Sequence, residues 1–157
     1  MRWALYLSAL VAAVAWTGSP RLAAAAEPSA IASERGRAKV DWTRIAVPPS
    51  DDSARTERVL RKLLDRAVKK ADFGKARKLS ASVRVLELQS ELRDGVLRVS
   101  CTLVGKLQGG QSAKARISFG GDPSKAESLE LEVLTMVANG LVTRIAELAR
   151  ARAALEQ

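Results

Sequence analysis

The strongest constraint on the fold is the strict alternation of apolar and polar residues along two consecutive segments. In the first segment the apolar positions are Leu97, Val99, Cys101, Leu103 and Leu107, and the polar positions are Arg98, Ser100, Thr102 and Lys106. In the second, Ala113, Ala115, Ile117 and Phe119 alternate with Ser112, Lys114, Arg116 and Ser118. Because successive side chains of a strand point to opposite faces, the pattern predicts two antiparallel strands with one buried face and one solvent-exposed face.

Turn sequences separate these segments from each other and from a third predicted strand. Asp94-Gly95 supplies the positive φ angles that a tight hairpin needs, and residues 108–111 contain two further glycines. The third strand spans residues 80–92, and its alternation slips near Val85, which predicts a bulge. The three strands together form an antiparallel meander.

One strand and one helix are predicted before this meander. Alternation from Lys39 to Ile45 indicates the strand, and Pro48-Pro49 ends it because proline cannot donate to a sheet ladder. Residues 50–53 supply N-cap candidates for the helix, and Gly74 is expected to close it in a left-handed turn. Its apolar stripe consists of Val59, Leu60, Leu63, Leu64, Ala67, Val68 and Ala71.

A second helix is predicted near the end of the chain. Ser124 and Glu127 match a capping box at its start. Residues 129–133 also alternate like a strand, so that segment stays open between the two structures, although the long 3.6-residue period favours helix. Charges between Glu130 and Glu147 exclude a membrane span. The apolar stripe consists of Leu134, Val137, Leu141, Ile145 and Leu148.

The predicted order of elements is therefore β-α-β-β-β-α. Such a chain forms an α+β two-layer sandwich, with a mainly antiparallel sheet and two helices on one face. We expect residues 38–153 to form this single domain, preceded by a flexible leader over residues 27–37. A length of 157 residues suits one domain with its own core.

The first 26 residues have the order of a secretory signal peptide. Met1-Arg2 is positive, residues 3–16 carry no charge, and the four alanines of residues 23–26 are typical of a cleavage site. A buried alanine-rich helix or an uncleaved anchor would give a similar pattern, but the apolar run is short for a bilayer span. We expect cleavage after Ala26 and export to the periplasm or the outside of the cell.

The composition excludes several kinds of active site. The chain has no histidine and one cysteine, which excludes Ser-His-Asp and Cys-His catalysis, histidine-ligated metals and internal disulfides. The glycine motifs of nucleotide-binding loops do not occur. Asp51-Asp52, or Glu130 with Glu132, could serve a secreted hydrolase, which we keep as a remote alternative. We predict a non-enzymatic protein without catalytic, metal-binding or cofactor-binding residues.

Two single residues have alternative interpretations. Cys101 lies on the apolar side of its predicted strand, so we expect a small buried hydrophobic residue; the alternative is a free thiol that pairs with another chain. Trp42 is expected to be half-buried in the core, and the alternative is a contact surface beside Pro48-Pro49.

Positive charge is concentrated in one segment. After cleavage the chain would carry 24 basic and 17 acidic residues, and residues 55–78 alone hold ten basic and three acidic ones. This excess is either a solvated helix face or a docking surface for anionic lipid, lipopolysaccharide phosphates or an acidic protein. Nucleic acid is not expected, because the segment has one aromatic residue. The candidate binding residues are Arg55, Arg58, Arg61, Lys62, Arg66, Lys69 and Lys70.

The order of elements resembles a family of bacterial envelope proteins, the lipopolysaccharide-assembly lipoproteins that plug the outer-membrane translocon. The matching features are the strand ending Ile45-Ala46-Val47, the helix with Val59-Leu60 and Leu63-Leu64, the hairpin from Leu86 to Gly110 and the final long helix. The lipid-bearing cysteine expected of that family is missing. Residues 96–101 are also similar to uncharacterised exported proteins of predatory soil bacteria.

These observations lead us to expect a non-enzymatic exported protein of the cell envelope that acts as a binding or assembly accessory factor. It would bind its partner through the sheet surface or the basic helix. The alternative is a carrier of anionic lipid or lipopolysaccharide that uses the Arg55–Lys78 segment. The expected partners are thus an envelope protein or an anionic lipid, with no nucleic acid, no cofactor and no transmembrane helix after cleavage.

Overall fold

The computed structural model describes residues 38–155, which form four strands and two long helices. The predicted signal peptide and leader, residues 1–37, lie outside the described residues. The order of elements is the predicted one. It runs β1 (Lys39–Ala46), α1 (Ser53–Lys70), β2 (Lys78–Arg93), β3 (Val96–Leu107), β4 (Ser112–Gly121), a 3₁₀ turn η2 (Pro123–Lys125) and α2 (Ala126–Leu155).

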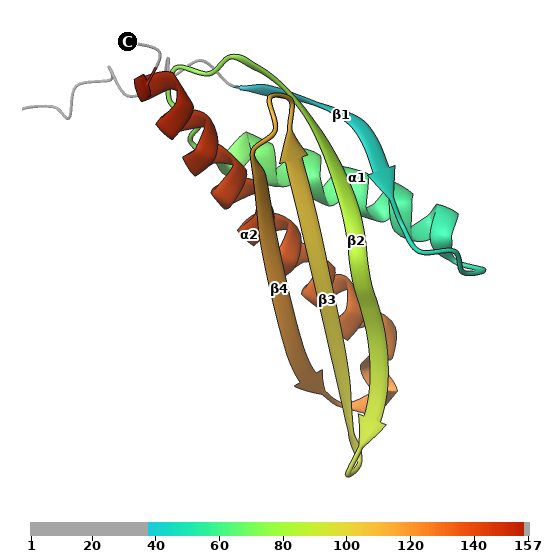
Figure 1. The fold of residues 1–157 in the computed structure, drawn as a ribbon. Helices are drawn as coiled ribbons and strands as arrows, with labels where there is room; N and C mark the ends of the chain where they lie inside the picture. The colour runs from blue at the N-terminus through green and yellow to red at the C-terminus, as the bar shows by residue number, and fades with distance from the viewer. Residues whose placement is uncertain (1–37, 156–157) are drawn as a thin grey trace, which may run out of the picture. The chain divides into compact units, whose positions relative to one another are not determined.

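The four strands form one open sheet in the order β1-β2-β3-β4. β2, β3 and β4 pair antiparallel, as predicted for the meander. β1 pairs with β2 in parallel, because α1 returns the chain to the same end of the sheet before β2 begins. Both helices cover the same face of the sheet (Figure 1), which confirms the α+β two-layer sandwich.

The irregular positions of the sheet fall largely where the sequence placed them. The register of β2 against β3 shifts between Val85 and Glu87, which confirms the predicted bulge and leaves Leu86 exposed. Asp94 and Gly95 have φ angles of 52° and 77°, as a tight hairpin turn requires. A second shift, between Trp42 and Arg44 of β1, has no counterpart in the sequence pattern.

The core lies between the apolar face of the sheet and the two helices. Leu103 of β3 and Leu141 and Ile145 of α2 are fully buried in it. Gly105 allows α2 to approach β3 closely, since a Cβ atom there would lie 2.8 Å from Cδ1 of Ile145. The close approach seals the apolar face and leaves the opposite face of the sheet without a covering layer.

The start of α2 settles one open alternative and corrects one prediction. Leu129 and Val133 are both buried at helical spacing, so residues 129–133 are helix and not strand. The predicted capping box is wrong: Asp122 takes the cap position because Pro123 opens the turn, and its Oδ1 accepts from the Ser124 amide at 2.9 Å. This bond and that from the Ser124 hydroxyl lower the pKa of Asp122.

Both ends of α1 also differ in detail from the prediction. Asp52 occupies the N-cap position, but its side chain makes no capping hydrogen bond. The helix ends at Lys70, with Ala71 extended, so Gly74 does not close it. Gly74 instead adopts its φ of 62° in the following turn, where its amide donates to Oδ1 of Asp72 at 2.9 Å.

We predict that Leu141→Ala lowers the free energy of unfolding by about 2–5 kcal/mol, because it opens a cavity between α2 and β3. The same substitution at Leu155, which is 85% exposed, is the matched control and should change stability little. Urea denaturation of both variants measures the difference. Equal losses of stability would contradict the assigned position of α2.

Candidate functional site

The seven predicted binding residues all lie on the exposed side of α1. The opposite side of the helix is anchored in the core by Leu60, Leu63, Leu64 and Ala67. Arg58, Lys62, Arg66 and Lys69 follow one another at intervals of four, four and three residues, so they form one stripe along the helix. We call the seven exposed residues the basic face of α1.

A hydrogen bond between β1 and α1 fixes which side of the helix is exposed. Nε1 of Trp42 donates to Oδ1 of Asp65 at 3.0 Å. The predicted half-burial of Trp42 was an underestimate, because the side chain is 5% exposed. Asp65 is thus one of two carboxylates on α1, with Glu57, and its hydrogen bond joins the helix to β1.

Three of the seven basic side chains have contacts within the protein. Arg55 pairs with Glu127 of α2 at 3.7 Å, Arg61 pairs with Glu57 at 3.6 Å, and Nε of Arg58 donates to the Ala54 carbonyl at 3.1 Å. Such exposed pairs contribute little to stability. Among the described residues, no carboxylate pairs with the other four: Lys62, Arg66, Lys69 and Lys70.

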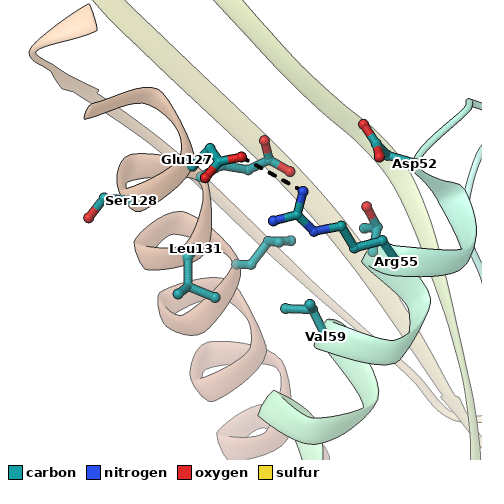
Figure 2. Close-up of a pocket in the computed structure, with 9 residues that line it drawn as sticks. Asp52, Arg55, Val59, Glu127, Ser128 and Leu131 are labelled. Atoms are coloured by element: carbon teal, nitrogen blue, oxygen red, sulfur yellow. Dashed lines mark ion pairs between the residues drawn. The ribbon is translucent and has the colours of Figure 1, made fainter. Parts of the chain in front are cut away.

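A groove of about 620 Å³ lies between the first turns of α1 and of α2. Figure 2 shows Arg55 and Glu127 meeting across it, with Val59 and Leu131 contributed by the two facing helices. Leu131 is 49% exposed, so the groove offers an apolar wall beside the basic face of α1. The groove therefore has apolar walls, and its charged lining residues are Arg55 and the carboxylates of Asp52, Glu127 and Glu130.

The structure reveals a second basic surface on the open side of the sheet. The strands carry nine basic and three acidic residues, and the alternation directs all of them to the face that no helix covers. The basic residues are Lys39, Arg44, Lys78, Arg84, Arg93, Arg98, Lys106, Lys114 and Arg116, and the acidic ones are Asp41, Glu87 and Glu91. We call this surface the open face.

Counting charge by segment concealed the open face. The sequence pattern predicts that Arg98, Lys106 and Lys114 lie on one side of the meander. In the net charge of the chain, however, carboxylates far away in the sequence cancel the charge of these residues. Most of those carboxylates lie on α2 and in turns, on the other side of the sheet or at its ends. The net excess along the chain still lies in residues 55–78, but a count along faces shows that the open face also carries more basic than acidic residues.

One carboxylate on the open face is occupied by its neighbours. Glu87 accepts hydrogen bonds from the Ser100 hydroxyl at 3.4 Å and the Thr102 hydroxyl at 3.2 Å, and it lies 3.9 Å from Arg116. Thr102, predicted to face solvent, is 3% exposed because these side chains cover it. The cluster joins β2, β3 and β4 across the open face, and Arg116 offsets the negative charge of Glu87.

Cys101 is fully buried on the apolar side of β3, as its first interpretation predicted. Burial, followed by the negative charges of Glu87 and Glu130, raises the pKa of the thiol to about 12. Since the unfolded thiol ionises near its ordinary pKa of 9.0, the stabilising effect of the buried thiol is present below pH 9 and is lost as pH rises toward 12.

Two kinds of site are absent from the described part of the chain. No cluster of three or more acidic or cysteine side chains that could hold a metal ion occurs within residues 38–155. None of the helices in this range is both long and apolar enough to cross a membrane.

Comparison with known proteins gives similarities at the level of the fold. No known family profile matches the chain, and no curated protein matches its sequence. The chain is similar to a candidate lipoprotein from Caulobacter crescentus, at 13% identity and a TM-score of 0.46, over 75% of this chain and 92% of that one. It is also similar to the PelC dodecamer from Paraburkholderia phytofirmans, at 17% identity and a TM-score of 0.38, over 69% and 88% of the two chains.

A third similar structure is rare lipoprotein B from Shewanella oneidensis, at 16% identity and a TM-score of 0.36, over 73% of this chain and 99% of that one. At these values the similarities assign neither a family nor an activity. The resemblance to lipopolysaccharide-assembly lipoproteins stays a prediction.

We predict that Asp65→Ala lowers the free energy of unfolding by about 1 kcal/mol, because it removes the acceptor of the partly buried hydrogen bond from the indole N–H of Trp42. Asp65→Asn keeps an acceptor oxygen but has no charge, so it should retain most of the stability. The two variants together distinguish the contribution of the hydrogen bond from that of the negative charge. Thermal unfolding checks both variants. If the Asn variant were as unstable as the Ala variant, the hydrogen bond from Trp42 would not be the source of the lost stability.

We predict that iodoacetamide at pH 8 leaves Cys101 of the folded protein unmodified and alkylates it once the protein is unfolded in urea. The reason is that the thiol is buried and its pKa is raised to about 12, so the reactive thiolate is neither formed nor accessible. Intact-mass spectrometry gives the readout. Rapid alkylation of the folded protein would favour the alternative of a free thiol available to another chain.

Proposed function

We propose that the protein is a non-enzymatic binding or assembly factor of the cell envelope, which docks an acidic partner protein on the basic face of α1. The export it requires follows from the predicted signal peptide. The observation that carries the proposal is the set of seven exposed basic side chains on one helix, five of which have no carboxylate partner among the described residues.

The electrostatics of α1 support a docking role over a solvated face. Like charges at a spacing of four residues repel and destabilise a helix, and Arg58, Lys62 and Arg66 stand at that spacing. A negatively charged partner would relieve the repulsion and would also be drawn to the surface from a distance. The hydrogen bond from Trp42 to Asp65 holds this surface in one orientation, which suits recognition of a partner.

A second candidate function is the binding of anionic lipid or lipopolysaccharide along the same helix. The groove between α1 and α2 favours it, because Leu131 and Val59 offer apolar contacts within reach of the cationic stripe. An acyl chain in the groove would then accompany a headgroup on the basic face of α1. The two candidate functions use the same basic side chains of α1 and differ in whether a protein or a lipid binds to them.

Charge reversal of Arg58, Lys62 and Arg66 to Glu tests the proposal by in-cell crosslinking and mass spectrometric identification of the crosslinked partner. We expect the yield of the partner to fall at least about tenfold, since each reversed charge removes roughly 1 kcal/mol or more of attraction. The matched control reverses Arg93, Arg98 and Lys114 on the open face, which gives the same net charge. An equal loss in both triple variants, or in neither, would refute docking on α1.

Vesicle flotation separates the two candidates. A lipid-binding protein floats with vesicles that contain anionic lipid at 0.1 M salt and is released at 1 M, where the screening length falls from about 10 Å to about 3 Å. Flotation that the α1 triple variant abolishes would favour the lipid candidate. Crosslinking to a protein without flotation would favour the partner protein.

A further inference from the structure

The open face contains a hollow at the end of the sheet where β3 turns into β4. The register shift between Trp42 and Arg44 displaces Thr43 from the β1–β2 ladder, and its hydroxyl donates to the Ala81 carbonyl at 3.3 Å. The hollow beside this bulge has a volume of about 440 Å³. Its polar lining consists of Thr43, Ser80, Ser82, Lys106 and Gln108, with Gly109 and Gly110 at its rim.

The lining of the hollow is rich in hydrogen-bond donors and contains no carboxylate. The hydroxyls of Ser80 and Ser82, the carboxamide of Gln108 and the ammonium group of Lys106 supply these donors, whereas the Thr43 hydroxyl already donates to the Ala81 carbonyl. Gly110, at a φ of 98°, leaves open space where a side chain would stand. A group that accepts several hydrogen bonds and carries negative charge fits such a lining.

The surroundings of the hollow are strongly cationic. Arg44 and Lys106 flank Ser82 on its two neighbouring strands, and Arg84 and Lys114 occupy the next row of the sheet. The described part of the chain shows no ion pair for these four basic residues. Asp41 is the carboxylate on this part of the open face; it pairs with Ser80 in the ladder and does not line the hollow.

We propose that the hollow is a binding site for a phosphate group, in the form of a phosphate monoester or of free inorganic phosphate. A phosphate monoester presents three terminal oxygens, which the hydroxyls of Ser80 and Ser82 and the ammonium group of Lys106 can engage together. The phosphate is carried by a sugar phosphate or is free inorganic phosphate; both share this chemistry. The site lies on the side of the sheet opposite α1, so it is independent of docking on the basic face of α1.

Titration of the purified full-length protein with inorganic phosphate, followed by amide NMR at low ionic strength, tests the site. We expect saturable shifts of the amides of Thr43, Ser82 and Gly110. Lys106→Gln should weaken binding at least about tenfold, because it removes a charge-assisted hydrogen bond. Lys125→Gln is the matched control and should leave binding unchanged, since Lys125 is exposed and follows the opposite end of β4.

A second arm identifies the carrier of the phosphate. Glucose 6-phosphate that binds more tightly than inorganic phosphate would support a sugar phosphate, and equal affinities would support free phosphate; glucose alone should not bind. Ser82→Ala should weaken phosphate binding without unfolding the protein, as its circular dichroism verifies. Shifts that do not saturate, that persist in Lys106→Gln, or that glucose alone produces would overturn the proposal.

Discussion

The packing of α2 against the apolar face of β3 and β4 determines most of what the rest of the molecule can do. Gly105 allows the helix to lie close to β3, and Leu141 and Ile145 fill the space that its missing side chain leaves. Because the strand side chains alternate, covering one face of the sheet with α2 commits every charged strand residue to the other face. α1 completes the apolar layer over β1, where Trp42 and Asp65 hold it by a hydrogen bond.

This arrangement gives the protein two basic surfaces on different sides of the sheet. The basic face of α1 lies beside a groove with apolar walls and carboxylates in its lining, and its cations suit an acidic protein. The open face is broad and hydroxylated, and its hollow beside Lys106 is lined by hydrogen-bond donors. Two carboxylates on these surfaces accept hydrogen bonds within the protein: Asp65 accepts from Trp42, and Glu87 accepts from Ser100 and Thr102. Two such surfaces would let one molecule hold two anionic partners at once.

The elements could be predicted because their signals are local, whereas much of the site depends on contacts between distant residues. The alternation of β3 and β4, the bulge near Val85 and the stripe of α1 follow from periods of two or 3.6 residues. The cap at Asp122 was missed because Ser124 and Glu127 matched a motif that Pro123 overrides. The solvent-exposed face of the sheet was predicted, but its excess of positive charge was missed because charge summed along the chain hides charge that is segregated by face. Its hollow was missed because the lining residues come from β1, β2, β3 and the following turn.

The claim that one face of the sheet is sealed and the other is open and basic can be tested by cysteine scanning along β4. In a Cys101→Ala background, single cysteines are placed at residues 113, 114, 115 and 116, and their rates of alkylation are measured in the folded protein. We predict fast reaction at 114 and 116, where Lys and Arg face solvent, and slow reaction at 113 and 115, where both alanines are buried under α2. Similar rates at all four positions, or the inverse pattern, would contradict the account.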